Sequence, residues 1–403
     1  MAARAAAAAG PGEPRSVVIG MVGAGQLARM TAQAAISLGV RFRVLADTAS
    51  DSAAQVCADV TVGDYRSASD LLAFGTGCDV VTFDHEHVPG AHLADLESVT
   101  AVRPGGPALR FAQDKAAMRE RLAELGVRVP RYQRVATRAE VARFAAGQAP
   151  DRAGGGWPVA LKATSGGYDG KGVWICADEA AAAEVLAHGI GLIAEEFVPF
   201  DRELAVLVAR SPKGQGAAYP VVQTVQQDGI CREVVAPAPG LADDLAVEAQ
   251  LLALRLAAEL GVTGLLAVEL FEAGGELIVN ELAMRPHNSG HWTMDGAVTS
   301  QFEQHVRAVL DLPLGSPAMN VPQAVMVNVL GGEDPDLYSR FVHVMAADPG
   351  VRVHLYGKRV RPGRKVGHVT VAGDDLGRLR ERAWRAANYL SLGTEEPDGR
   401  ILP

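Results

Sequence analysis

Residues 157–172 read Trp-Pro-Val-Ala-Leu-Lys-Ala-Thr-Ser-Gly-Gly-Tyr-Asp-Gly-Lys-Gly, and this stretch says most about the fold. Its apolar start predicts a buried strand that carries one ammonium group, on Lys162. Four glycines follow within seven positions, at 166, 167, 170 and 172. Such a segment suits a flap whose backbone N–H groups close over phosphates, with the lysine beneath as a point charge. It is no Walker A loop, because no Gly-Lys-Ser/Thr opens a helix here. A plain glycine-rich hairpin turn is the alternative.

Composition limits the class of protein. The chain has 403 residues, 48% of them hydrophobic, which suggests two or three domains. A net charge of −9 argues against an extended nucleic-acid interface. The four cysteines are scattered without a Cys-x-x-Cys pair, which favours unlinked thiols over a disulfide framework or zinc site. No apolar run reaches the roughly 20 residues of a membrane helix. We therefore expect a cytoplasmic protein without nucleic-acid or membrane partners, and residues 1–15 as a disordered tail.

Strand and helix patterns alternate at the start of the chain. Residues 16–22 are typical of a buried parallel strand, residues 26–38 have helical spacing, and strands follow at 42–46 and 79–83. This alternation predicts an α/β domain with a doubly wound sheet. The later helices are predicted at 113–125, 138–146, 242–260, 302–310 and 376–390, the later strands at 132–135, 193–198, 203–209, 265–271 and 276–282, and short strands with a basic turn at 358–368 beyond residue 320.

Gly23-Ala-Gly-Gln-Leu-Ala28 follows the first predicted strand and opens a helix. It matches Gly-x-Gly-x-x-Ala, and Asp47 ends the second strand about 20 residues on, as in a dinucleotide-binding fold. The motif itself predicts only a tight turn and a helix N-terminus able to hold an anion. An oxidoreductase with a nicotinamide or flavin cofactor is therefore a rival hypothesis, although a different nucleotide site follows downstream.

Acidic residues stand at the ends of two predicted strands. Glu195-Glu-Phe-Val198 ends one strand, and Glu203 begins the next. A strand end that offers carboxylate and backbone groups can hydrogen-bond an adenine edge and a ribose. The alternative is an ordinary solvated acidic edge.

A second acidic pair lies on the predicted hairpin of residues 265–282. Glu269 and Glu281 would face each other if the two strands pair, and Asn280 adds a neutral oxygen. Two carboxylates with nucleotide phosphates make a usual Mg²⁺ site. Two exposed strand carboxylates are the alternative, which is less favoured because Glu269 lies in an apolar run where an unpaired charge is costly.

Two polar clusters follow the hairpin. Arg285-Pro-His-Asn-Ser-Gly-His-Trp292 places one arginine and two histidines at the exit of a strand, which favours anion contacts over a metal site because no Cys or carboxylate ligand accompanies them. His291 is equally well explained as a structural histidine. Lys358 and the segment Arg359-Val-Arg-Pro-Gly-Arg-Lys-Val-Gly-His368 gather basic residues at a Pro-Gly turn, which suggests a bound phosphate or carboxylate. A solvated basic turn is the alternative.

Together these motifs resemble the ATP-grasp ligases, and within that superfamily the N5-carboxyaminoimidazole ribonucleotide synthetases. The segments that carry the resemblance are Gly25-Gln-Leu-Ala-Arg-Met30, Gly166-Gly-Tyr-Asp-Gly-Lys-Gly172, Asn280-Glu-Leu-Ala283, Arg285-Pro-His-Asn-Ser-Gly-His-Trp-Thr293 and Arg361-Pro-Gly-Arg-Lys-Val-Gly-His368. The resemblance implies an ATP-grasp architecture of mixed α/β class. Beyond the tail 1–15, it implies an N-terminal Rossmann-like domain at 16–108, a flap-bearing domain at 109–202, and a C-terminal domain with a basic-turn subdomain at 203–403.

The resemblance also implies an activity of de novo purine biosynthesis. A homodimeric ligase would use ATP, Mg²⁺ and bicarbonate to carboxylate 5-aminoimidazole ribonucleotide through carboxyphosphate. Implied ATP contacts are Lys115, Lys162, Gly167, Tyr168, Asp169, Gly170, Lys171, Gly172, Glu195, Glu196, Phe197, Val198, Glu203, Gln226, Asn280 and Glu281, with Glu269 and Glu281 on the metal. Implied ribonucleotide contacts are Gln26, Leu27, Glu86, Tyr168, Asp169, Lys171, Lys358, Arg364 and Lys365. Implied catalytic residues are Arg285, His287, Asp169 and Lys365.

Some positions depart from the family pattern. Lys171 replaces a frequent arginine, which loses the bidentate fork. Met284 stands where proline is expected, Gln226 where some members have histidine, and Asp84-His85 where glutamate and an aliphatic residue are usual. Each departure weakens one assigned contact. Another ATP-grasp carboxylase or a formate-dependent ligase is the nearest alternative, and an NAD-dependent oxidoreductase is the distant one.

Overall fold

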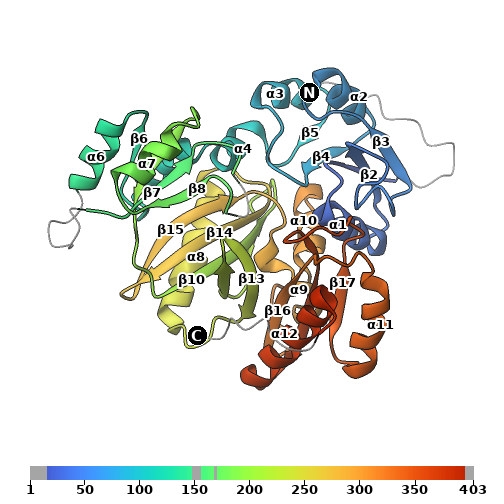
Figure 1. The fold of residues 1–403 in the computed structure, drawn as a ribbon. Coiled ribbons are helices and arrows are strands. Elements are labelled where there is room, and N and C mark those ends of the chain that lie inside the picture. Colours follow the sequence, from blue (N-terminus) through green and yellow to red (C-terminus); the bar gives the residue numbers. More distant parts are fainter. Residues whose placement is uncertain (1–15, 148–155, 168–169, 395–403) are drawn as a thin grey trace.

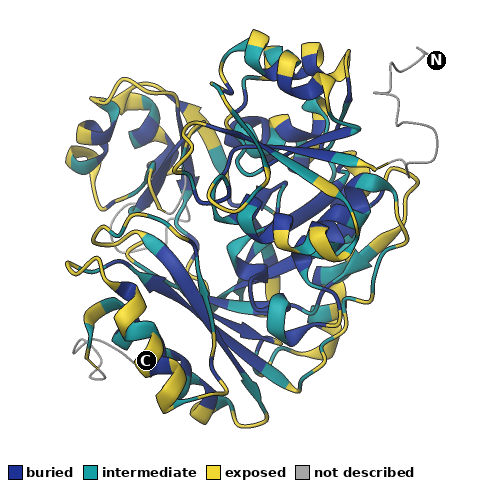
Figure 2. Cartoon of the chain, turned by 90° about the vertical axis from the view of Figure 1, so that its right-hand side faces the viewer, coloured by how far each residue is buried: buried dark blue, intermediate teal, exposed yellow. Residues whose placement is uncertain are grey.

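The computed structural model describes residues 16–147, 156–167 and 170–394, which form three β-sheets flanked by helices (Figure 1). Buried residues concentrate in the strands of each sheet, while the outward faces of the helices are exposed (Figure 2). Within this described part of the chain, no helix combines the length and apolar character that crossing a bilayer requires.

The N-terminal sheet is doubly wound, as the alternating pattern predicted. Its strands follow the order β3-β2-β1-β4-β5, and every pair is parallel. The strand order reverses at β1, so the carboxyl ends of β1 and β4 flank the crevice where such sheets bind ligands. The elements are β1 (Val18–Val22), α1 (Gln26–Ser37), β2 (Arg41–Ala46), β3 (Asp59–Val62), α2 (Ala68–Thr76), β4 (Val80–Phe83), α3 (Gly90–Glu97) and β5 (Ala101–Val102).

A close contact between α2 and β1 holds this helix against the sheet. A Cβ atom on Gly20 would lie 2.8 Å from Phe74 Cε1 and 2.5 Å from Cys78 Sγ. Glycine at position 20 therefore lets the Phe74 ring pack directly on the strand backbone, where it is 1% exposed.

The second sheet carries the flap. Its antiparallel strands follow the order β6-β9-β7-β8, and the flap connects β7 to β8. Every residue of β7 is buried, including Lys162, as the apolar run predicted. The elements are α4 (Gly106–Gln113), α5 (Lys115–Glu124), β6 (Tyr132–Val135), α6 (Arg138–Ala146), β7 (Val159–Ala163), β8 (Val173–Cys176), α7 (Glu179–Leu186) and β9 (Leu192–Glu196).

The helix predicted at 113–125 is confirmed as α5, which begins two residues later because Gln113 still belongs to α4. Asp114 separates the two helices with an extended backbone, and its carboxylate accepts hydrogen bonds from Ala116 N and Ala117 N at 2.8 and 3.0 Å. Aspartate is a strong N-cap residue, so it ends α4 and begins α5. The break lets Lys115 N donate to Thr164 O at 2.9 Å, which ties α5 to the start of the flap.

The third and largest sheet is antiparallel, with nine strands among the described residues. The order is β15-β14-β10-β12-β13-β16-β18-β17, and β11 pairs with β10. The elements are β10 (Arg202–Arg210), β11 (Gly216–Ala218), β12 (Val222–Gln227), β13 (Ile230–Ala236), α8 (Asp243–Glu259), β14 (Gly264–Ala273), β15 (Glu276–Ala283), η1 (Asn288–Gly290), α9 (Thr293–Gly296), α10 (Gln301–Leu310), β16 (Gln323–Leu330), α11 (Leu337–Ala347), β17 (Arg352–Leu355), β18 (Lys365–Gly373) and α12 (Leu376–Leu392).

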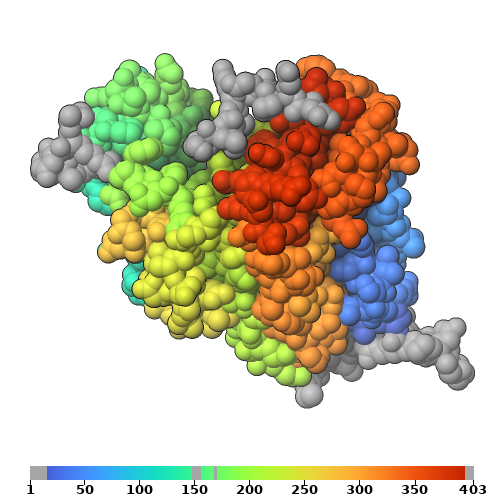
Figure 3. Space-filling view, turned by 90° about the horizontal axis from the view of Figure 1, so that it is seen from below, coloured from blue at the N-terminus to red at the C-terminus, as the bar shows by residue number. Residues whose placement is uncertain are grey.

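The hairpin predicted from residues 265–282 is confirmed as β14 and β15. The expectation of only short strands beyond residue 320 was wrong, because β16 and β18 have 8 and 9 residues and continue the large sheet. The final helix, α12, packs on these two strands beside α11, and its red surface lies next to orange surface in the view from below (Figure 3).

We predict that Phe74→Ala destabilises the N-terminal sheet by about 3–5 kcal/mol, because it opens a cavity against Gly20 that cannot close. Urea unfolding followed by far-ultraviolet circular dichroism measures the change. Ile36→Ala is the matched control on α1, since that side chain is 78% exposed, and it should shift the free energy of unfolding by under about 0.5 kcal/mol. Equal effects of both variants would contradict the packing described.

Candidate active site

One cavity of about 1100 Å³ lies where the three sheets meet. Its wall includes the residues after β1 and β4, the faces of β7 and β9, the β14–β15 hairpin, and the basic turn before β18. Most residues implied by the resemblance line it: Gln26, Leu27, Glu86, Lys115, Lys162, Gly167, Gly170, Glu195, Glu196, Phe197, Val198, Glu203, Gln226, Glu269, Asn280, Glu281, Arg285, His287, Lys358 and Lys365.

Three implied residues that the structure describes do not line the cavity: Lys171, Gly172 and Arg364. Tyr168 and Asp169 lie outside the described residues. Arg364 is exposed, and its Nη1 donates to Arg359 O at 3.2 Å, so its guanidinium closes the turn on itself.

A buried ion-pair network holds Lys162. The Glu195 carboxylate, 1% exposed, accepts from Lys162 Nζ at 2.7 Å and from Arg119 Nε at 2.6 Å. Lys162 Nζ also donates to Asn280 Oδ1 at 2.9 Å, and Arg119 Nη2 donates to Asn280 O at 2.6 Å. The network therefore joins the helix α5 to β7 and β9 of the flap sheet and to β15 of the large sheet.

Electrostatics keep Glu195 ionised. Burial raises the pKa of its carboxyl, but Arg119 and Lys162 outweigh that effect and lower the pKa to about 2. Because both carboxylate oxygens are taken by these cations, Glu195 holds Lys162 in place rather than offering a free acceptor to a ribose.

The two carboxylates of the hairpin lie opposite each other. Glu269 pairs directly with Glu281 across β14 and β15, beside a bulge after Glu269. Lys115 Nζ forms an ion pair with Glu281, and His287 Nε2 lies 3.2 Å from Glu269 Oε1. Burial raises the pKa of Glu269, but the hydrogen bond from His287 and the nearby lysines lower it overall. Glu269 is thus held as an anion at the cavity wall, opposite Glu281.

These two carboxylates fit a divalent cation that is shared with a ligand. Among residues 16–147, 156–167 and 170–394, no group of three or more His, Cys, Asp or Glu side chains could hold a metal alone. Two carboxylates with the neutral oxygen of Asn280 supply only part of an octahedral shell. The remaining oxygens would have to come from phosphates and water, which is the usual situation of Mg²⁺.

Glu203 differs from Glu195 and Glu269 because the pKa of its carboxyl is raised. Burial and the neighbouring charge of Glu269 raise its pKa from 4.5 to about 7, although Lys162 acts in the opposite direction. Apolar residues of the cavity wall come from the flap sheet (Ala160, Val173 and Ile175) and from the large sheet and the segment before it (Phe200, Phe271 and Leu282), and we call this set the apolar slot. Phe200 and Phe271 stack with ring centroids 4.6 Å apart. An apolar wall that also includes a carboxylate suits a nucleoside.

The cluster after β15 is held by Glu86, which follows β4. Glu86 Oε1 accepts from Met284 N at 2.6 Å, and Glu86 Oε2 lies 3.4 Å from Arg285 Nε. His287 N donates to Gln301 Oε1 at 2.8 Å. His291 is fully buried against Gln301, and burial lowers its pKa well below the usual range, so it is neutral. Arg285, His287 and the neutral His291 all line the cavity.

At the N-terminus of α1, a side chain of the protein already accepts hydrogen bonds from two of the backbone N–H groups. Asp84 Oδ2 accepts from Gly25 N at 2.7 Å, and Asp84 Oδ1 accepts from Ala28 N at 2.9 Å. A carboxylate thus stands where the diphosphate of a dinucleotide would approach, and Asp47 does not line the cavity. The backbone N–H groups of Gln26 and Leu27 have no partner among the described residues, which leaves room for a smaller anion.

The tip of the β12–β13 hairpin meets the flap, a contact the sequence analysis missed. A Cβ atom on Gly170 would lie 2.7 Å from Gly229 Cα, so the two glycine backbones touch. Asp228 and Gly229 both have positive φ angles, of 52° and 74°. Asp-Gly flanked by alternating residues is the usual signal of a tight hairpin, and it would have predicted this element.

Family models match three successive parts of the chain. The ribonucleotide synthetase preATP-grasp domain matches residues 17–113, the ATP-grasp domain residues 120–302, and the phosphoribosylaminoimidazole carboxylase C-terminal domain residues 324–382. The N5-carboxyaminoimidazole ribonucleotide synthase of Mycobacterium tuberculosis is 55% identical over 93% of this chain and 88% of the relative.

The chain belongs to the N5-carboxyaminoimidazole ribonucleotide synthase family.

Solved structures of this family share the fold. The N5-carboxyaminoimidazole ribonucleotide synthetase of Thermus thermophilus is 40% identical with a TM-score of 0.82, over 95% of this chain and 100% of that one. The Aspergillus clavatus enzyme in complex with ADP and 5-aminoimidazole ribonucleotide is 31% identical with a TM-score of 0.85, over 93% and 98%. The mixed α/β, ATP-grasp architecture is therefore confirmed.

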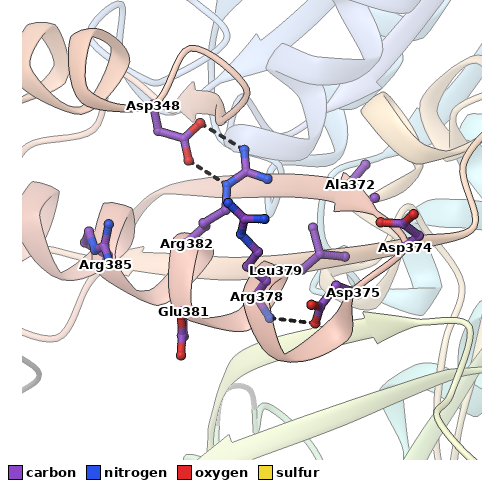
Figure 4. A pocket seen from close by; sticks show the side chains of 10 residues that line it. Asp348, Ala372, Asp374, Asp375, Arg378, Leu379, Glu381, Arg382 and Arg385 are labelled. Carbon is purple, nitrogen blue, oxygen red and sulfur yellow. Dashed lines mark hydrogen bonds and ion pairs between the residues drawn. The ribbon is translucent and has the colours of Figure 1, made fainter.

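A second hollow, of about 680 Å³, is remote from the residues implied by the family (Figure 4). It lies between the end of β18, α12 and Asp348. Arg382 donates to the Asp348 carboxylate from Nε and Nη2, at 2.7 and 2.9 Å, and Arg378 and Arg385 lie on the same helix beside further acids. Because cations and carboxylates alternate around this hollow, it has no side where charges of one sign gather.

We predict that Glu203→Gln stabilises the protein increasingly as pH rises from 5 to 8. The carboxyl ionises near pH 7 in the folded protein but near 4.5 when unfolded, so its ionisation opposes folding above pH 4.5, and the full penalty is present above 7. The gain should reach up to about 3 kcal/mol at pH 8, measured by urea unfolding.

Glu140→Gln is the control of opposite sign. Hydrogen bonds from Ala136 N and the Thr137 cap lower the pKa of Glu140, so its ionised form supports folding at neutral pH. That variant should lose stability relative to the parent above pH 5. Parallel pH trends in the two variants would contradict the assigned burial of Glu203.

Proposed function

We propose that this protein carboxylates 5-aminoimidazole ribonucleotide with bicarbonate at the expense of ATP, forming N5-carboxyaminoimidazole ribonucleotide, ADP and phosphate. One observation carries the proposal. One cavity is lined by the apolar slot and two lysines of the flap-bearing region as well as by the N-terminus of α1 and lysines of the basic turn. The names of the relatives, and the ADP and ribonucleotide complex of the Aspergillus clavatus enzyme, support the same pairing of ligands.

The ATP end lies between the flap sheet and the large sheet. Adenine would occupy the apolar slot, with hydrogen bonds to the Glu196–Val198 edge, and its ribose would lie against Glu203. Lys115 and Lys162 would face the phosphates, and Gln226 would line the slot near the flap. The flap around Gly167–Gly172 would then exclude water, which matters because carboxyphosphate hydrolyses readily.

Mg²⁺ would be held by Glu269 and Glu281, with Asn280 beside them. When bound, it neutralises charge on the phosphoryl oxygens that are transferred. Lys115 and His287 would have to turn from these carboxylates towards the phosphates and bicarbonate. Chelation of Mg²⁺ should therefore stop ADP release, and added Mg²⁺ should restore it.

The ribonucleotide end lies against the N-terminal sheet. Its phosphate would bind the free N–H groups of Gln26 and Leu27, with Lys358 and Lys365 as counter-ions. Glu86 would approach the ribose or the amine. From the family resemblance we also assign Tyr168 and Asp169, with Asp169 orienting the exocyclic amine, and Lys171 near the same end of the flap.

The chemistry divides into two transfers. A bicarbonate oxygen attacks the γ-phosphorus, the bond to ADP breaks, and carboxyphosphate forms. Arg285 and His287 would hold the bicarbonate and then the carboxyphosphate, where their charge offsets the developing anion. The amine nitrogen then bonds to the carboxyl carbon, or to CO₂ released from it, as phosphate leaves and the amine loses a proton.

Release of ADP from the purified protein with Mg-ATP and bicarbonate tests this function. We expect strong stimulation by 5-aminoimidazole ribonucleotide and none by glycinamide ribonucleotide or formate. Stimulation by those compounds instead would favour a different ATP-grasp ligase. Binding of NADH without binding of ATP would favour the oxidoreductase, which the position of Asp84 opposes.

We predict that substitutions of two lysines have different kinetic effects, because the lysines lie at the two ends of the cavity. Lys162→Ala should lower kcat at least about 100-fold, because it removes charge at the phosphates. Lys365→Ala should mainly raise KM for the ribonucleotide, about tenfold to 100-fold, and leave KM for ATP within a factor of two. Lys213→Ala, at an exposed ion pair with Asp311, is the control and should match the parent enzyme. Equal losses for both substrates in both active-site variants would contradict the assignment.

We also propose a cytoplasmic homodimer, as the family resemblance implies. Light scattering coupled to size exclusion should then give twice the mass of the chain, and a single-chain mass would refute the dimer.

A further inference from the structure

The segment Tyr356–Lys358 crosses from the large sheet to the N-terminal sheet. The Tyr356 side chain is 1% exposed and packs with Leu27, Met30 and Phe302. Its hydroxyl is hydrogen-bonded to His368 Nδ1 at 2.8 Å. The start of the segment is thus fixed between α1 and α10, far in sequence from both.

A loop of the N-terminal sheet, residues 50–55, holds the backbone of this segment. Ser52 Oγ donates to Tyr356 O at 2.5 Å, and Gln55 Nε2 donates to Gly357 O at 2.8 Å. The loop is itself tied, since Gln55 Nε2 also donates to Ser50 O and Arg29 Nη1 donates to Ser52 O, both at 2.8 Å. Two successive carbonyls therefore receive hydrogen bonds from residues more than 300 positions earlier.

Glycine is required where the segment meets the loop. Gly357 has a φ of 65°, a conformation that side chains disfavour. A Cβ atom there would also lie 2.7 Å from Gln55 Oε1 and 2.9 Å from Arg29 Nη1. The backbone of the segment therefore packs directly against the loop.

Because the backbone of Tyr356 and Gly357 is fixed in this way, the position of the next residue, Lys358, is fixed as well. Lys358 Nζ donates to Gln26 Oε1, at the N-terminus of α1, and lies 5.7 Å from the Tyr356 ring centroid. Gln26 and Lys358 both line the main cavity, whereas neither Ser52 nor Gln55 does.

We propose that Ser52 and Gln55 are positioning residues for the ribonucleotide end of the cavity. They fix the backbone that carries Lys358, and so keep its ammonium beside the helix N-terminus that receives the substrate phosphate. A lysine side chain has many rotamers, so its placement depends on a fixed backbone. The inference rests on the proposed function, because it needs a phosphate-bearing substrate at this end.

Gln55→Ala is the direct test, since Gln55 is exposed and the variant should fold. We expect calorimetric binding of 5-aminoimidazole ribonucleotide to weaken about threefold to tenfold, the loss typical of one hydrogen bond. KM for the ribonucleotide should rise equally, with KM for ATP and the melting temperature little changed. Gln133→Ala, an exposed glutamine on β6, is the matched control and should leave all four quantities unchanged.

A double-mutant cycle separates positioning from general damage. In a Lys358→Ala background, Gln55→Ala should weaken ribonucleotide binding no further, because the group it positions is gone. Ser52→Ala should show the same dependence on Lys358. Parent-like binding by Gln55→Ala, or additive losses in the double variant, would overturn the inference. A parent protein that binds no ribonucleotide would instead overturn the proposed function, and the inference with it.

Discussion

The arrangement of the site depends on one buried carboxylate that two cations share. Glu195 forms ion pairs with Lys162, which lies on the same sheet, and with Arg119 of α5. Arg119 also donates a hydrogen bond to the backbone of β15. Removal of one partner from such a buried pair typically costs about 3–5 kcal/mol, because the remaining charge has no solvent. The strand that carries Lys162 is thereby fixed against the hairpin that carries Glu281. The spacing between Lys162 and the carboxylates of the β14–β15 hairpin therefore depends on this network.

Parts of this arrangement could be predicted from the sequence because they are local. The opposition of Glu269 and Glu281 follows from two strands and a short turn, and the structure pairs these residues directly. Arg119 could not be predicted, because one arginine in a helix looks solvent-facing until the packing of three other elements is known. The distinct sequence motif around Arg364 suggested a phosphate contact, yet the chain turns that guanidinium onto Arg359 O. The Asp228-Gly229 hairpin, by contrast, had a recognisable signal.

The N-terminal sheet shows how a nucleotide-binding topology can serve another ligand. The Gly-x-Gly-x-x-Ala turn, the parallel strand order and the helix N-terminus are all present, and they justified the oxidoreductase hypothesis. Asp84 changes what the helix can bind, because its carboxylate takes the N–H groups of Gly25 and Ala28. Among the described residues, the N–H groups of Gln26 and Leu27 between them have no partner, and Lys358 reaches Gln26 from more than 300 positions later in the chain.

The proposed mechanism has one central claim. Bicarbonate accepts the γ-phosphate of ATP in this cavity before the ribonucleotide receives the carboxyl group. The most direct measurement follows the oxygen atoms. With Mg-ATP, 5-aminoimidazole ribonucleotide and freshly dissolved ¹⁸O-labelled bicarbonate, the mechanism predicts one ¹⁸O atom in each phosphate released. Mass spectrometry of the phosphate reports this directly. Unlabelled phosphate, released at the same rate as ADP, would show that water or another group accepts the phosphoryl group, and would contradict the mechanism.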